Sequence, residues 1–272
     1  MYLPIHCGKA ISNADLGIQG DDTGDNISHM NPHYCELTAM YWAWKNLKNV
    51  DYIGLCHYRR YFKINGGKKP LVFFDDLQAI DEKMIDASTI PSLLNKYDVI
   101  LPNHKYNSRS VYELFNTGTI EMLMQVFIRV LIKMHPEYSA TLYKYLNGNK
   151  VINYNMFISD WHFFDSYCTF LFPVLDAIHL RLKPMHYTYY NRLVSMFAEI
   201  LLVVYCFHEK CKIKQVPVIY LDQPETSWKD YIPCKHILNR TKNNLKFTIA
   251  SEKKNLINRY WDMYLKQDNI II

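Results

Sequence analysis

Short apolar runs bounded by polar or turn residues recur along the chain and predict β-strands. These runs are DYIGLCHY (51–58), YDVILP (97–102), VINYNMFIS (151–159) and IKQVPVIYL (213–221). Pro217 interrupts the last run, and because proline cannot donate a ladder hydrogen bond, this segment is expected to be an edge strand.

Between these runs, longer stretches carry apolar residues on a helical period. Asn31 and Pro32 have the cap-plus-proline pattern that opens a helix, which is expected to run through PHYCELTAMYWAWKNLK. Further helices are expected before Tyr97, over 110–147 with a division near Pro136, and over about 160–182 and 188–209. Strands that alternate with helices indicate an α/β fold, a mostly parallel sheet flanked by helices.

Charge divides the chain into two parts. The net charge of +5 arises within residues 228–272, where nine Lys/Arg face four acids, so residues 1–227 are neutral. We therefore expect one domain over 1–227 and a basic appendage over 228–272. A neutral body argues against nucleic acid as a partner. The appendage also carries Phe247, Tyr260, Trp261 and Tyr264. This mixture suits the anionic inner face of a cell membrane, with a solvated helical face as the alternative.

Cysteine usage and hydropathy bear on the compartment. The seven cysteines are odd in number and scattered among apolar residues, which is typical of free thiols in a reducing cytoplasm. No basic segment followed by an apolar stretch opens the sequence, so no signal peptide is recognised. The most apolar run, MFAEILLVVYCF, is much shorter than the ~20 residues of a membrane span. A cytoplasmic protein, at most peripheral on the membrane, is expected.

The first candidate site is HYRRYF, directly after the strand DYIGLC. Ligands of open α/β sheets bind beyond the carboxyl ends of strands. His57, Arg59 and Arg60 supply donors there, and Tyr58 supplies a flat ring, a combination suited to a diphosphate or a sugar. The alternative is that some of these side chains are solvated and others pack inward.

Three further polar residues stand in apolar surroundings. Asn155 lies in the run VINYNMFIS, where a buried amide needs partners, either a sugar hydroxyl or the backbone. Glu36 and Glu199 lie in apolar helices, which is costly unless the carboxylate is paired in a salt bridge or functional.

Sequence motifs for metal or nucleotide binding are absent. The chain contains no Asp-x-Asp, no Gly-x-Gly-x-x-Gly and no Walker loop. The loop DDTGDNIS could bind a cation or hydroxyls, but it lacks the ligand spacing of a calcium loop, and a solvated loop is an equal alternative. No cofactor is therefore assigned. A divalent metal held by Asp25 or Asp22 stays open.

Longer sequence motifs give a more specific indication of the family. DDTGDNISHMNPHYCELTAMYWAWKN, GLCHYRRYF, YDVILP and YNMFI occur in this order. Together they resemble a bacterial family known as a domain of unknown function, whose members occur in capsule, exopolysaccharide and lipopolysaccharide gene clusters and look like glycosyltransferases of the GT-A type. The resemblance extends from Tyr2 to about Asp222.

The resemblance implies transfer of a hexosyl or galactofuranosyl group from a nucleotide sugar, most naturally a UDP-sugar, to a cell-surface polysaccharide or lipid-linked glycan. It assigns donor binding to Asp25, Asn26, Asn31, His57, Tyr58, Arg59 and Arg60, and sugar binding to Asn155. Ser28 and Glu36 match the same family motif as Asp25, Asn26 and Asn31. Without Asp-x-Asp, His57, Arg59 and Arg60 are expected to balance the departing diphosphate. Glu199 and then Glu36 are the candidate catalytic bases.

Three departures from the family pattern matter. Family members begin with another strand and a His-Lys turn ahead of the equivalent of YLPIH, whereas Met1 stands directly before it. That strand is central in a GT-A fold, so a missing N-terminal strand and unpaired ladder groups are expected. A family Glu-Arg-Leu reads Glu-Ile-Leu at Glu199, and a family histidine is replaced within VYELFNTGT. The alternative function is thus a truncated, weak or inactive member that acts as a binding protein.

Overall fold

The computed structural model describes residues 2–65, 71–74, 86–118, 121–182 and 192–221, together with the single positions 229, 232, 238, 241 and 242. Its helices are α1 (Asn31–Tyr34), α2 (Leu37–Asn46), α3 (Ile90–Leu94), α4 (Val111–Gly118), α5 (Glu121–Met134), α6 (Ser139–Asn147), α7 (Trp161–Leu182) and α8 (Leu193–His208). Short 3-10 turns lie at Lys9–Ile11, Ser28–Met30 and Pro136–Tyr138.

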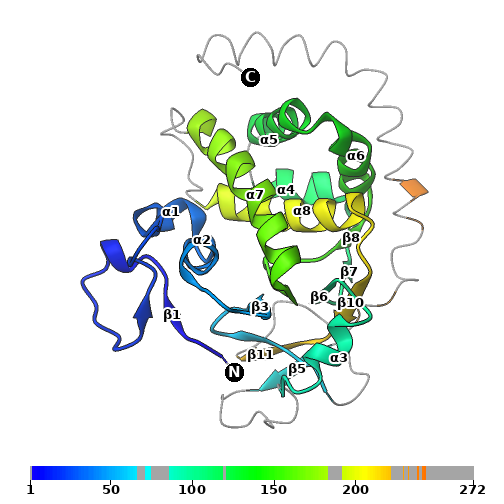
Figure 1. The fold of residues 1–272 in the computed structure, drawn as a ribbon. Helices are drawn as coiled ribbons and strands as arrows, with labels where there is room; N and C mark the ends of the chain where they lie inside the picture. The colour runs from blue at the N-terminus through cyan, green and yellow to red at the C-terminus, as the bar shows by residue number, and fades with distance from the viewer. Residues whose placement is uncertain are drawn as a thin grey trace.

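The strands are β1 (Ile5–His6), β2 (Gln19–Gly20), β3 (Tyr52–Leu55), β4 (Arg60–Phe62), β5 (Leu71–Phe74), β6 (Val99–Pro102), β7 (Lys105–Tyr106), β8 (Lys150–Val151), β9 (Phe157–Asp160), β10 (Ile213–Val216) and β11 (Val218–Leu221). Helices and strands alternate along the chain, which confirms the predicted α/β class (Figure 1). Most of the basic appendage lies outside the described residues.

The main sheet has four strands in the order β10-β6-β9-β3. β10 pairs with β6 in parallel, while β9 is antiparallel to both β6 and β3. The sheet is therefore mixed in its pairing, which corrects the expectation of a mostly parallel one. Because β9 is reversed against both neighbours, β3, β6 and β10 share one direction, and their carboxyl ends meet at the edge where β9 begins.

Pro217 divides the last predicted strand in two. Residues before it form β10 at one edge of the main sheet, and residues after it form β11 at the centre of a second sheet, β4-β11-β5. Proline offers no N–H to continue a ladder, and its carbonyl instead accepts a hydrogen bond from the Lys63 N–H at 2.9 Å. The expected edge strand is thus correct for β10 and wrong for β11.

The helix predicted from Asn31 is also broken. Cys35 has φ of 51°, a left-handed conformation, and separates α1 from α2. The Asn31 side-chain amide donates to the Cys35 carbonyl at 2.9 Å and so stabilises the break. As a result Glu36 stands at the amino-terminal end of α2, where the helix dipole favours a carboxylate.

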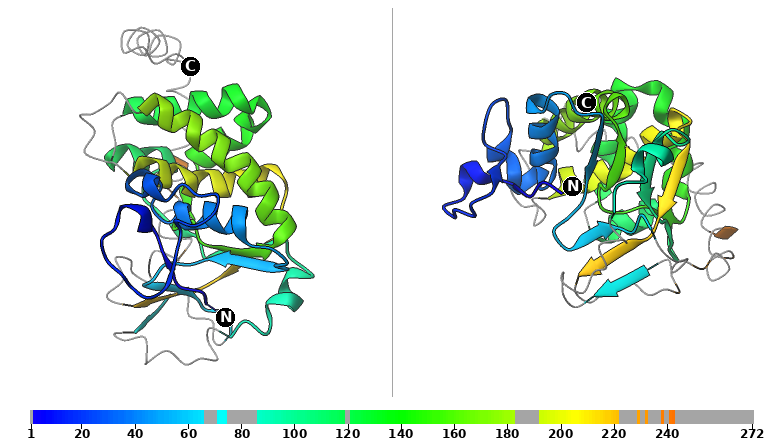
Figure 2. Two further views of the ribbon diagram at one scale, coloured as in Figure 1. Left: turned by 60° about the vertical axis from the view of Figure 1, so that its left-hand side comes forward. Right: turned by 60° about the horizontal axis from the view of Figure 1, so that its bottom comes forward.

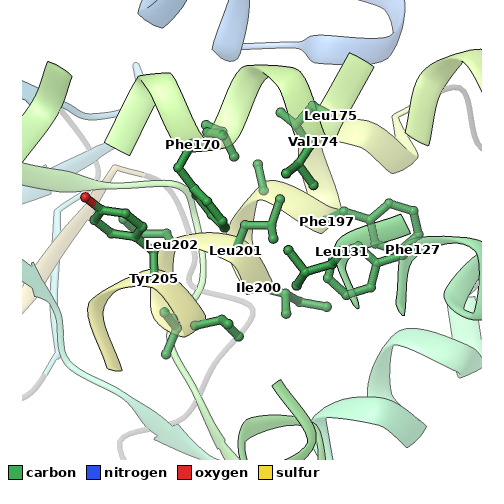
Figure 3. Close-up of a cluster of buried hydrophobic side chains, with 14 of the residues drawn as sticks. Phe127, Leu131, Phe170, Val174, Leu175, Phe197, Ile200, Leu201, Leu202 and Tyr205 are labelled. Carbon is green, nitrogen blue, oxygen red and sulfur yellow. The ribbon is translucent and has the colours of Figure 1, made fainter. Parts of the chain in front are cut away.

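Helices α4–α8 gather in a layer on one side of the strands, while α3 lies on the other (Figures 1 and 2). α8 is buried almost all round, and its Phe197 stacks on Phe127 of α5 with ring centres 4.7 Å apart (Figure 3). Ile90 of α3 closes a smaller core on the opposite face of the sheet, with Phe62, Ile100 and Ile158. None of the described helices combines the length and apolarity needed to cross a bilayer.

Candidate functional site

A polar cluster lies at the edge where β3, β6 and β10 end and β9 begins. Leu55 of β3 is in register with Phe157 of β9, so the residues after Leu55 and those before Phe157 meet there. His57 follows β3, and the turn Tyr154–Asn155 precedes β9. Glu36 from α2 and Glu199 from α8 complete the group. The structure thus brings together four residues predicted from the sequence.

The Tyr154–Asn155 turn differs from the predicted strand. Strand β8 ends at Val151 and β9 begins at Phe157, and between them Tyr154 has φ of 85° and Asn155 has φ of 40°. A left-handed conformation is costly for a bulky residue such as tyrosine and persists only where surrounding contacts hold it. Such positions concentrate at functional sites.

Asn155 joins two helices through its side-chain amide. Its Nδ2 donates to the Glu36 Oε1 at 2.8 Å and to the Ser195 carbonyl at 3.0 Å. The residue is only 3% exposed, and within the described part of the chain its Oδ1 has no hydrogen-bond partner. A carboxylate and a backbone carbonyl therefore satisfy the donors of the amide, and its one buried acceptor is left for a donor such as a hydroxyl group.

His57 connects the turn with Glu36. Its Nε2 lies 3.0 Å from the Tyr154 carbonyl oxygen and 4.0 Å from the Glu36 Oε1. A carbonyl oxygen can only accept, so this geometry places the proton on Nε2. The Glu36 carboxylate, which also accepts from the Ser195 hydroxyl at 3.4 Å, is held by an amide, a hydroxyl and an imidazole. The salt bridge expected as the alternative for Glu36 is thus represented, among the described residues, by the pairing with His57, which is ionic only when the imidazole is protonated.

Glu199 lies one turn after Ser195 on α8, so the two share a face of the helix. Part of its surface is open to solvent, yet protein surrounds its carboxyl closely. The pKa of Glu199 is raised to about 7, chiefly by burial and to a smaller extent by the nearby Glu36 charge. A hydrogen bond from the Tyr154 backbone N–H and the charges of Arg60 and Lys105 act in the opposite direction. A carboxyl with a pKa near neutrality can exchange a proton at physiological pH.

Two cations approach the ring of Tyr154. The Arg60 guanidinium carbon lies 4.3 Å from the ring centre and the Lys105 Nζ 4.9 Å from it. Lys105 Nζ also donates to the Tyr154 hydroxyl at 2.8 Å, and that hydroxyl lies 3.1 Å from the Tyr220 hydroxyl. Positive charge therefore gathers near the Glu199 carboxyl.

Arg59 and Tyr58 have a different environment from Arg60. Tyr58 is 76% exposed, and the exposed Arg59 lies along its ring at 5.1 Å. Arg60 is half-buried at the start of β4. Tyr58 and Arg59 form the turn between His57 and Arg60, which pair with each other as an antiparallel bridge. HYRR therefore divides into a base that faces the cluster and a turn at the surface.

The remaining predicted residues lie in the loop before α2. The exposed Asp25 accepts from the Tyr41 hydroxyl at 3.3 Å, and the Asn26 amide bonds within its own loop, to the Gly24 carbonyl at 3.0 Å. Asn31 binds Cys35, as described above. These contacts fix the loop and the helix break, and the structure does not place Asp25 or Asn26 beside His57.

A metal does not fit the described residues. Asp22 is exposed, and the buried Asp21 accepts from the Gly8 and Lys9 N–H groups at 2.9 and 3.1 Å. Among the residues that the structure describes, no three His, Cys, Asp or Glu side chains lie close enough to hold an ion. No chemical step is therefore assigned to a metal.

Lys105, Ser195 and Tyr220 were not singled out from the sequence. Lys105 follows the carboxyl end of β6, so the strand-end rule that identified His57 also applies to it. Ser195 acts mainly through its backbone carbonyl, and Tyr220 points from the second sheet. No pattern in the sequence identifies these two.

An apolar cavity of about 910 Å³ adjoins the cluster. Its lining includes the whole of β3, Met40 and Trp42 of α2, and residues Tyr2 to Ile5, and it reaches Glu36 and His57. Within the described ranges no strand pairs with β3 on its outer side. The ladder groups of β3 on that side therefore face the cavity.

Comparisons with known proteins bear on the family. The model of the family described as "Domain of unknown function (DUF4422)" matches residues 1–210. The solved structure of the WbbM bifunctional glycosyltransferase superposes with a TM-score of 0.72 at 29% sequence identity, over 81% of this chain. This chain spans 42% of that protein. A search of curated proteins gave no match. The structural likeness confirms the predicted GT-A-like α/β fold.

Proposed function

Since the chain belongs to the family described as a domain of unknown function (DUF4422), we propose that it is a glycosyltransferase. The donor is a nucleotide sugar, with a UDP-sugar preferred, and the group transferred is a hexosyl or galactofuranosyl unit. The acceptor is a cell-surface polysaccharide or a lipid-linked glycan. Similarity to the WbbM bifunctional glycosyltransferase supports the class of reaction, while donor and acceptor follow from the family resemblance.

The observation that carries the proposal is Glu199 at the carboxyl edge of the sheet. Its pKa of about 7 lets the carboxylate take a proton at neutral pH, and it lies with Glu36 beside Arg60 and Lys105. A base and a source of positive charge are the two requirements of glycosyl transfer without a metal.

In the proposed step, Glu199 removes the proton of an acceptor hydroxyl. The hydroxyl oxygen forms a bond to the anomeric carbon, and the bond from that carbon to the phosphate oxygen breaks. The electron pair departs with the nucleoside diphosphate, whose charge the cations balance. The free Oδ1 of Asn155 accepts a hydroxyl of the sugar, and Glu36, held by His57 and Asn155, keeps that amide in place.

The test is a screen of nucleotide sugars by thermal shift, followed by a transfer assay with the donor that binds. A rise in melting temperature with one nucleotide sugar and turnover that is insensitive to EDTA are expected. Turnover that EDTA abolishes would contradict the metal-free step. Failure of every nucleotide sugar to bind would overturn the proposal.

The second candidate is a non-catalytic member that binds a glycan or a partner. The edge of β3, which pairs with no strand within the described ranges, and the apolar cavity beside it favour this candidate, since both offer a surface to a partner. Tight binding of a nucleotide sugar without transfer or hydrolysis would support it. An in-frame strand and His-Lys turn encoded just upstream of Met1 would favour the active enzyme.

We also propose a cytoplasmic location with peripheral binding to the inner membrane face, carried by residues 228–272. The basis is the charge and aromatic content of this segment, because most of it lies outside the described residues. Removal of residues 228–272 is expected to reduce binding to anionic liposomes, and unchanged binding would contradict the role.

A further inference from the structure

The two cations beside Tyr154 lie in an unusual electrostatic setting. Both Arg60 and Lys105 are half-buried, and both contact the same ring. The two contact distances place their cationic centres within about 9 Å of each other. Like charges at this separation repel, and partial burial strengthens the repulsion.

In the part of the chain that the structure describes, no carboxylate pairs directly with either cation. Within the described part of the chain, neither Arg60 nor Lys105 has a carboxylate within the 4.0 Å of an ion pair. The Arg60 Nε is moreover buried without a hydrogen-bond partner. Glu199 is close enough to feel both charges, but burial holds its pKa near 7, so it is only partly ionised at neutral pH. The arrangement has an excess of donors and positive charge, which an anionic ligand would satisfy.

The position of the pair matches a ligand at the carboxyl edge of the sheet. Lys105 follows the end of β6, and Arg60 opens β4, which pairs with β11 next to Tyr220. Tyr154 links the two cations to Glu199 and His57 through its backbone N–H and carbonyl. An anion between Arg60 and Lys105 therefore lies next to the carboxyl that takes the proton.

We propose that Arg60 and Lys105 form the binding site for the diphosphate of the donor, with Tyr154 as the platform that sets their spacing. This inference rests on the proposed glycosyl transfer and names residues of the same site. Lys105 supplies the second positive charge, and the exposed Arg59 contributes less to binding of the diphosphate. Tyr154 is a positioning residue, since it acts through its neighbours.

The experiment measures binding of inorganic pyrophosphate and of UDP by isothermal titration calorimetry at low ionic strength. Lys105→Met and Arg60→Met are expected to weaken both ligands at least tenfold, because each removes a charge-assisted hydrogen bond. Arg59→Met should change affinity less than threefold. Lys105→Arg retains the charge and is expected to restore most of the affinity. This conservative variant also shows that the loss does not come from misfolding.

Lys214→Met is the matched control. The Lys214 Nζ also lies over a tyrosine ring, 5.7 Å from the ring centre of Tyr97. Lys214 is on β10, and Tyr97 precedes β6, away from the carboxyl edge of the sheet. The affinity of the Lys214→Met variant for pyrophosphate should equal that of the unmodified protein. Tyr154→Phe keeps the ring and removes the hydroxyl that Lys105 binds, so its affinity should fall by a smaller factor than that of Lys105→Met.

The outcomes separate this inference from the proposed function. Unchanged binding in Lys105→Met, with a UDP-sugar still bound and transferred, would overturn the diphosphate site and leave the function standing. Pyrophosphate binding that depends on Lys105 and Arg60, without binding of any nucleotide sugar, would support the anion site and contradict the function. Failure of pyrophosphate and UDP to bind the unmodified protein would overturn the inference.

Discussion

Two sets of residues on α8 have opposite characters. Phe197 stacks on Phe127, and Leu201 is fully buried in the core that α5, α7 and α8 share (Figure 3). Ser195 and Glu199, on another face of the same helix, belong to the polar cluster. The first set is apolar and closely packed. The second contains a carboxyl with a raised pKa next to a strained turn.

The difference between these two faces of α8 shows where the fold is optimised for stability and where it is not. Packed apolar side chains each contribute stability, whereas a buried carboxyl and an unpartnered amide oxygen reduce it. Proteins retain such groups where binding or catalysis requires them. Substitutions on the two sides of α8 should therefore affect stability and activity in opposite ways.

The largest effect on stability is expected from Phe197→Ala. The variant leaves a cavity against Phe127 and should lower the free energy of unfolding by about 3–5 kcal/mol, measured by urea denaturation. Phe207→Ala on the same helix is the control, because Phe207 is 49% exposed. A loss below ~1 kcal/mol for Phe197→Ala would show that this face is not closely packed.

The largest effect on activity is expected from Glu199→Gln. The amide has nearly the same shape but cannot take a proton, so transfer should fall by roughly 10²–10⁴-fold while binding of the donor persists. The free energy of unfolding at pH 8 should stay the same or rise. Glu137→Gln, at an exposed position before α6, should leave transfer unchanged. Comparable activity in both variants would remove Glu199 from the mechanism.

The pH dependence of stability provides a third comparison. A pKa of about 7 in the folded protein lies above the 4.5 of a free glutamic acid, so the folded state holds this proton more tightly. The contribution of Glu199 is complete below pH ~4.5 and is lost as the pH rises through 7. The full loss is at most about 3 kcal/mol. The difference in unfolding free energy between Glu199→Gln and the unmodified protein should follow this curve, and a difference independent of pH would contradict the raised pKa.

A loss of stability smaller than that of Phe197→Ala is expected from Asn155→Ala. It removes the amide that joins Glu36 to the Ser195 carbonyl, which should cost about 1–3 kcal/mol in the free energy of unfolding. Affinity for a nucleotide sugar should also fall, with affinity for pyrophosphate nearly unchanged. Asn95→Ala, at an exposed position after α3, is the control. Equal losses for both ligands would argue against a contact between Asn155 and the sugar.

Much of the fold follows from local patterns. The apolar runs at β3, β6 and β9 and the helices α4 to α8 were predicted, because strand and helix periods in these segments agree with their burial. The division near Pro136 was predicted, whereas the break at Cys35 was not. Cys35 adopts a left-handed conformation within an otherwise helical pattern, and the Asn31 amide that stabilises it comes from the tertiary arrangement of the turn.

The candidate site also has residues that were predicted from the sequence and features that were not. The strand-end rule led to His57 and Arg60, and the cost of burying a carboxylate led to Glu36 and Glu199. Asn155 was placed in a strand, because the apolar run around it hides a turn whose backbone conformation depends on His57, Glu36 and α8. Composition alone cannot show that Arg59 is exposed while Arg60 is not, since both follow the same strand.

The cluster draws on segments that are far apart along the chain. The partners Asn155 and Glu36 are separated by 119 residues, and Ser195 and Glu36 by 159. Closing loops of this length is entropically costly and comes late in folding. During synthesis, a chain that has not yet emerged past Tyr220 cannot hold the complete cluster, because the Tyr154 hydroxyl still lacks its Tyr220 partner. Ligand binding at this site therefore reports that synthesis and folding of residues up to β11 are complete.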